Sequence, residues 1–83
     1  MKEEVLTKAI ELKKQLDYQR RVLKLGNSVY TSIKVYFEDE LIHDNVRITD
    51  DVLGDNVIKE LKAKAIANIE KRINDLLEEL EKL

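Results

Sequence analysis

The sequence predicts an α+β fold in which an N-terminal helix, a two-stranded antiparallel hairpin and a long C-terminal helix follow one another. Apolar residues recur at helical spacing over residues 3–25 and again over 50–82. Between these stretches, residues 28–38 alternate apolar and polar side chains with the period of two that is typical of a strand. A length of 83 residues predicts a single domain, 1–83. The absence of proline predicts long helices.

Residues 3–25 are expected to form the first helix, because no glycine or proline interrupts them. Gly26 is predicted to end it at the position after the last helical residue, where glycine adopts a left-handed conformation at little cost. Arg20, Arg21 and Lys24 suit the negative end of the helix dipole. The apolar face follows a spacing of four and three and consists of Val5, Ala9, Leu12, Leu16, Gln19 and Leu23, widened by Leu6, Ile10 and Val22.

Residues 28–38 are expected to form the first strand, and the second strand lies within 41–49, where Ile42, Val46 and Ile48 fall on one face. Two hairpin registers compete. A turn at residues 39–40 pairs Phe37 with Ile42, whereas a turn at 44–45 has better turn chemistry and pairs Leu41 with Ile48. A loop within 39–45 is therefore predicted, and the register stays open.

Residues 50–82 return to a helical pattern, with Thr49 or Asp50 as the expected cap. Gly54 is a weak point in this helix, and Asp55 offers a place at which the helix would restart. Its C-terminal half has a strict heptad spacing of three and four, which is typical of a coiled-coil contact. This seam consists of Ile66, Ile69, Ile73, Leu76, Leu80 and Leu83.

The lengths of the two helices predict self-association. At 1.5 Å per residue, the second helix reaches about 45–50 Å and the first only about 34 Å. A short helix and one hairpin do not cover the whole apolar surface of the longer helix, so the seam is expected to contact another copy of the chain. Small domains commonly gain stability in this way, and a homodimer or a higher homo-oligomer is expected, with the dimer favoured.

Composition excludes several classes of protein. The chain has no cysteine, which rules out a disulfide scaffold and a thiolate zinc site. Its longest apolar run is three residues, as at 35–37, so no membrane span is expected and a cytoplasmic location is predicted. Fifteen cations and 17 carboxylates give a net charge of −2, which favours a protein partner over nucleic acid.

The residues that carry chemistry do not form a recognisable active site. No phosphate-binding glycine loop, calcium loop or zinc-protease motif occurs. Glu78, Glu79 and Glu81 are expected to form a solvated helix face. His43 is the only imidazole and precedes Asp44, but no nucleophile motif accompanies this pair. The sequence therefore predicts a protein that is not an enzyme, without catalytic residues, cofactor or metal.

The polar face of the predicted hairpin is a candidate ligand face. It places Tyr30, Lys34 and Tyr36 on one side of the first strand, and Arg47 on the second strand faces the same way. Aromatic rings interleaved with cations stack on bases and bind phosphates. The competing interpretation is that these tyrosines only shield the sheet or pack on another copy.

The order of elements resembles small helix–hairpin–helix proteins of bacteriophages and mobile elements. The resemblance covers almost the whole chain through the stretches ELKKQLDYQRRVLKLGNS, SIKVYF, VRITDDVL and IEKRINDLLEELEKL. Such proteins are mostly uncharacterised, and a few act as oligomeric inhibitors or as sponges for host immune signals. The resemblance implies no particular functional residue, and Gly54 departs from the usual uninterrupted helix.

These observations lead to two hypotheses. The first is a homo-oligomeric interaction protein that binds or inhibits another macromolecule. The second is a module that sequesters a nucleotide-like ligand or binds single-stranded nucleic acid through Tyr30, Lys34, Tyr36 and Arg47.

Overall fold

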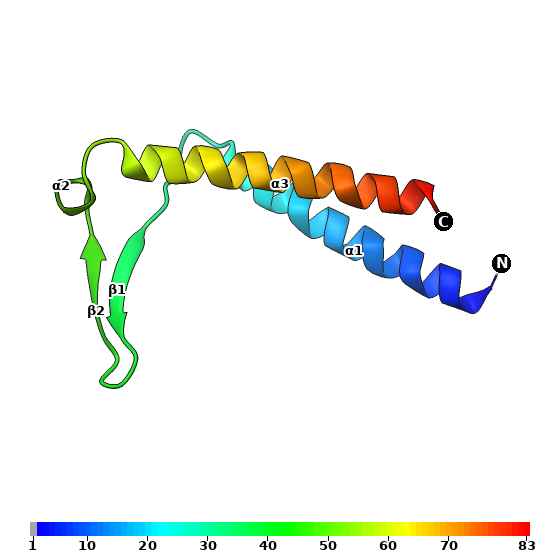
Figure 1. Ribbon diagram of the computed structural model, residues 1–83, viewed down its shortest axis with the longest axis horizontal. Helices are drawn as coiled ribbons and strands as arrows, with labels where there is room; N and C mark the ends of the chain where they lie inside the picture. Colours follow the sequence, from blue (N-terminus) through cyan, green and yellow to red (C-terminus); the bar gives the residue numbers. More distant parts are fainter. Residues whose placement is uncertain (1) are drawn as a thin grey trace.

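Two long helices lie side by side and a two-stranded hairpin projects from one end of them (Figure 1). This arrangement comes from a computed structural model that describes residues 2–83, and it confirms the α+β class. The elements in chain order are α1 (Glu3–Gly26), β1 (Val35–Asp39), β2 (Asp44–Ile48), α2 (Asp50–Leu53) and α3 (Val57–Glu81).

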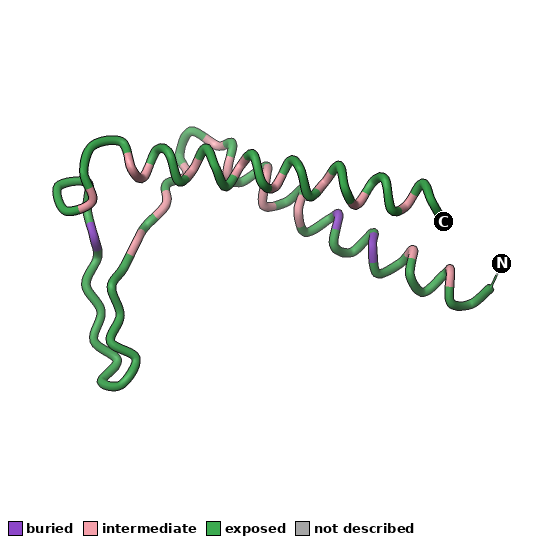
Figure 2. Tube along the Cα trace, viewed as in Figure 1, coloured by how far each residue is buried: buried purple, intermediate pink, exposed green. Residues whose placement is uncertain are grey.

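Helices α1 and α3 run antiparallel, so both chain ends lie at the same end of the molecule (Figure 1). The spacing of apolar residues in α1 explains its contact with α3, since residues three and four positions apart lie on the same face of a helix. Leu12 and Leu16 on that face are only 5% and 4% exposed, and they are the buried residues of α1 (Figure 2). A two-helix pair covers each helix from one side only, so the core is thin.

The seam of α3 has its nearest neighbour within the same chain. Its first five residues, from Ile66 to Leu80, are half-buried, while Leu83 at the chain end is 47% exposed. Gly26 of α1 approaches this seam closely, because a Cβ atom there would lie 3.5 Å from Cγ1 of Ile66. The predicted helical period is confirmed, and much of the seam's apolar surface packs on α1.

The end of α1 differs from the prediction. Gly26 is the last helical residue, and it does not adopt a positive φ angle. Asn27 caps the helix with φ −81° and ψ −8°, and its N–H donates to the Leu23 carbonyl at 3.0 Å. The N–H of Ser28 donates to the Leu25 carbonyl at 3.2 Å. These right-handed turns satisfy the terminal carbonyls, so no left-handed residue is required.

The first strand begins seven residues later than predicted, at Val35 instead of residue 28. The second strand has only five residues and α2 begins soon after it, so residues 28–34 find no facing strand. The ammonium of Lys62 on α3 binds this connecting segment instead. It donates hydrogen bonds to the carbonyls of Ser28 at 3.4 Å and Thr31 at 2.9 Å.

The predicted helix over 50–82 is divided into two. The four-residue α2 ends at Gly54, whose φ of 100° and ψ of 163° are essentially restricted to glycine. Asn56 is left-handed at φ 65°, and α3 begins at Val57. Thr49 occupies the N-cap position of α2, one of the two positions predicted, without a side-chain hydrogen bond. The helix restarts at Val57 after the cap residue Asn56, and not at Asp55 as predicted.

The hairpin gives the molecule an L shape that is flat in its third dimension (Figure 1). The principal extents are 56 × 32 × 18 Å. The radius of gyration is 17.8 Å, compared with about 12 Å for a compact domain of this length. The chain therefore exposes far more surface than its size requires.

Candidate interaction surface

The projecting hairpin, called the arm below, comprises residues 35–48. Its strands pair antiparallel with Val35 opposite Ile48, Tyr36 opposite Arg47 and Glu38 opposite Asn45. The loop therefore spans residues 40–43, inside the range predicted from the sequence. The register lies between the two that competed, and it keeps the apolar residues of both strands on a common face.

Local chemistry explains this loop. Oδ1 of Asp39 accepts hydrogen bonds from the N–H groups of Leu41 at 2.9 Å and Ile42 at 3.3 Å. Such an aspartate turn reverses the chain without help from the strands. His43 completes the loop with a φ of 56°, a left-handed conformation that histidine, like asparagine and aspartate, adopts more often than most residues other than glycine. The only histidine of the chain thus has a structural position at the end of the loop.

The apolar face of the arm is buried at its base and exposed at its tip (Figure 2). At the base, Ile48 is 5% exposed and Val35 is half-buried. Burying one such side chain contributes about 1.5–3 kcal/mol, which makes an exposed cluster a candidate binding surface. The arm-tip cluster consists of Phe37 (67% exposed), Leu41 (88%), Ile42 (67%) and Val46 (61%).

Carboxylates surround the arm-tip cluster. Glu38, Asp39, Glu40 and Asp44 line the same shallow depression as the four apolar side chains. Residues 38–44 contain these four carboxylates and no lysine or arginine. The tip of the arm is therefore both apolar and strongly acidic, a combination that favours a partner surface with apolar and basic side chains.

The candidate ligand face is only partly assembled. Tyr36 and Arg47 lie directly opposite one another on the arm, as that hypothesis requires. Tyr30, by contrast, is 95% exposed in a turn outside the sheet, where its N–H donates to Oγ of Ser28 at 3.3 Å. Lys34 precedes β1. The carboxylate of Glu38 follows on the same strand face as Tyr36, which opposes the binding of phosphate.

A second exposed stripe follows the side of α1 that faces away from α3, and sequence reasoning missed it. Its members are spaced by four, four, three and four residues, so they share one helix face. A signal was present, since apolar and cationic residues alternate along it. This stripe, called the α1 stripe below, consists of Ile10 (50% exposed), Lys14, Tyr18 (63%), Arg21 and Leu25 (63%).

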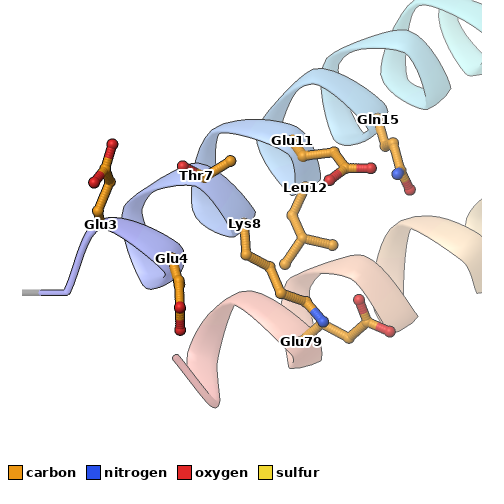
Figure 3. A pocket seen from close by; sticks show the side chains of 8 residues that line it. All are labelled: Glu3, Glu4, Thr7, Lys8, Glu11, Leu12, Gln15 and Glu79. Atoms are coloured by element: carbon orange, nitrogen blue, oxygen red, sulfur yellow. The ribbon is translucent and has the colours of Figure 1, made fainter.

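A cleft of about 600 Å³ opens where α1 and α3 diverge near the chain ends (Figure 3). It is lined mainly by the carboxylates Glu3, Glu4, Glu11 and Glu79, and Lys8 extends across it. Acidic side chains at one end of a helix pair are well solvated and do not by themselves define a reaction. Over residues 2–83, no group of three or more carboxylate, histidine or cysteine side chains is arranged to hold a metal ion.

The remaining candidate residues lie apart from one another. His43 is exposed at the arm loop, and Glu78, Glu79 and Glu81 are exposed near the end of α3. Oγ of Ser28 accepts the hydrogen bond from the N–H of Tyr30, and Ser28 lies in the connecting segment, away from the arm loop (Figure 1). Within the described part of the chain, no helix combines the length and apolar character that a bilayer span requires.

Comparison of the chain with protein-family models, with curated proteins and with solved structures finds no match. The arm tip, the α1 stripe and the Tyr36–Arg47 pair are the surface features of this chain that bear on its function.

Proposed function

We propose that this chain is a non-enzymatic interaction protein that acts as a homodimer and binds a further macromolecule. The observation that carries the proposal is the exposed area. One chain exposes 7351 Å², whereas a compact monomer of this mass exposes about 5,100 Å². The difference of about 2,200 Å² exceeds the roughly 800 Å² that each partner buries in a standard protein interface.

The thin core supports the same proposal. Leu12, Leu16 and Ile48 form the buried apolar set of the described residues. A two-stranded hairpin that projects into water is marginally stable, and small domains usually need an oligomer, a metal or disulfides as additional support. A second copy that covers the arm and the helix pair would supply the missing apolar contacts.

The two faces of the arm suggest how a dimer would still bind a partner. The apolar face of the arm would be covered in the dimer, which leaves the face of Tyr36 and Arg47 exposed. That face favours a protein partner, since Glu38, opposite Asn45, lies on the same strand face as Arg47 and offsets its charge. The second candidate function, binding of a nucleotide or single-stranded nucleic acid, rests on the Tyr36–Arg47 pair alone.

Analytical ultracentrifugation tests the proposal. We expect a dimer at micromolar concentration, and a folded monomer over that whole range would contradict the proposed function. The double variant Tyr36→Ala with Arg47→Ala is expected to keep the dimer, because both residues lie on the polar face of the arm. Binding of single-stranded DNA or RNA by the unaltered chain, lost in this variant, would establish the second candidate function instead.

A further inference from the structure

We infer that the arm tip of one copy docks on the α1 stripe of a second copy, and that the reverse contact forms at the same time. This inference rests on the proposed homodimer and deepens it by naming the two surfaces that meet.

The two surfaces are complementary in polarity. The arm tip has an apolar centre of four side chains surrounded by four carboxylates. The α1 stripe alternates three apolar side chains with the cations Lys14 and Arg21. Lys13, Arg20 and Lys24 flank the stripe, so residues 13–24 carry five cations and one carboxylate, Asp17. Apolar centres would pack together while opposite charges meet around them.

The shape of the chain makes the contact reciprocal. The arm projects on the side of the helix pair where α1 lies, and the two limbs enclose an angle in a flat molecule (Figure 1). The α1 stripe faces this angle, since the opposite face of α1 packs on α3. A second L-shaped copy related by a two-fold axis would place its arm in the angle, and each contact would occur twice.

Helix α3 offers no equivalent surface. The large apolar residues of α3 that are more exposed than its half-buried seam are Leu61 and Leu77, which are 40% and 37% exposed. They flank the contact with α1 and do not form a stripe on the outer side of α3. The outer side presents charged residues such as Lys64 and Lys71. The α1 stripe is therefore the surface of this chain that matches the arm tip.

A charge-exchange experiment tests the inference. The arm variant carries Glu40→Lys and Asp44→Lys, which spares Asp39 and its hydrogen bonds in the loop; Asp44 lies on the same strand face as Phe37 and Val46. The α1 variant carries Lys14→Glu and Arg21→Glu. The matched control carries Lys64→Glu and Lys71→Glu on the outer side of α3. Each variant changes two exposed residues, so circular dichroism well below the unfolding midpoint of each variant should show an unaltered helix content for all three.

Each of the first two variants alone is expected to dimerise about a hundredfold more weakly, because like charges then meet in both contacts. An equimolar mixture of the two should form a heterodimer with restored affinity, since lysines on the arm of one chain then face glutamates on α1 of the other. The control should dimerise like the unaltered chain. Sedimentation equilibrium measures all four samples.

The outcomes separate this inference from the proposed function. If the arm variant and the α1 variant each still dimerise like the unaltered chain, the inference is overturned. The homodimer would then form through another surface, such as the flanks of the seam. A mixture that stays monomeric would also overturn it. A monomeric unaltered chain would overturn the proposed function itself and assign the arm tip to a different protein.

Discussion

Backbone conformation at a few residues sets the changes of chain direction. His43, Gly54 and Asn56 have positive φ angles, and they end the arm loop, end α2 and precede α3, respectively. Positive φ suits glycine and asparagine but disfavours residues with a branched Cβ. Gly54 and Asn56 lie between the arm and α3 and help to set their relative direction, whereas His43 acts only in the reversal of the chain at the arm tip.

The two glycines are expected to respond oppositely to alanine. At Gly54, φ 100° and ψ 163° strain any side chain, so Gly54→Ala should lower the free energy of unfolding by about 1–3 kcal/mol. At Gly26 the backbone is helical and the added Cβ would meet Ile66 at an ordinary 3.5 Å. Gly26→Ala should therefore raise the free energy of unfolding by about 0.4–1 kcal/mol. Urea denaturation measures both changes in unfolding free energy. Equal effects would contradict the conclusion that Gly54 is strained by a side chain and that Gly26 is not.

Sequence reasoning recognised both glycines but assigned their conformations incorrectly in one case. Gly54 was expected to weaken the helix, and it ends α2. Gly26 was expected to be left-handed, but Asn27 and Ser28 supply the N–H groups that the end of α1 needs. Sequence spacing shows where a helix ends, but it does not show which neighbouring N–H groups satisfy the last carbonyls.

At the scale of elements, the sequence predicted the order of helices and strands because the apolar period changes from 3.6 to 2 and back. The length of β1 was not predictable in the same way. Residues 28–34 have strand-like alternation, but a strand needs a facing strand, and β2 ends at Ile48. The arm tip and the α1 stripe were missed for a related reason, since their exposure depends on tertiary packing.

The connecting segment provides a test at this scale. Lys62→Met removes the ammonium that binds the carbonyls of Ser28 and Thr31 while keeping most of the apolar stem. Hydrogen bonds from a charged donor contribute about 1.5–3 kcal/mol each at most, and this group is partly buried, so a loss of about 1–3 kcal/mol in unfolding free energy is expected. Lys64→Met is the matched control and should change stability by less than about 0.5 kcal/mol. Equal losses in urea denaturation would show that Lys62 does not hold the segment.

At the scale of the whole molecule, an extended chain with three buried apolar residues among residues 2–83 is expected to depend on its assembly for stability. Folding would then be coupled to dimerisation, and the midpoint of thermal unfolding would depend on protein concentration. A monomer that unfolds in a two-state transition has a midpoint that does not depend on concentration. The concentration dependence therefore reports whether the second copy completes the fold or only adds to it.

For a dimer of two such chains, the enthalpy of unfolding scales to about 120 kcal/mol, so the midpoint should rise by about 4 °C for each tenfold increase in concentration. Circular dichroism at 222 nm would follow the loss of helix on heating over a hundredfold range of protein concentration. The arm variant Glu40→Lys with Asp44→Lys should unfold at a lower midpoint than the unaltered chain at every concentration. An equimolar mixture of the arm variant and the α1 variant should recover both the midpoint of the unaltered chain and the increase of that midpoint with protein concentration. A midpoint that stays constant for the unaltered chain would mean that one chain is stable alone, and the exposed arm would then need a different partner to explain it.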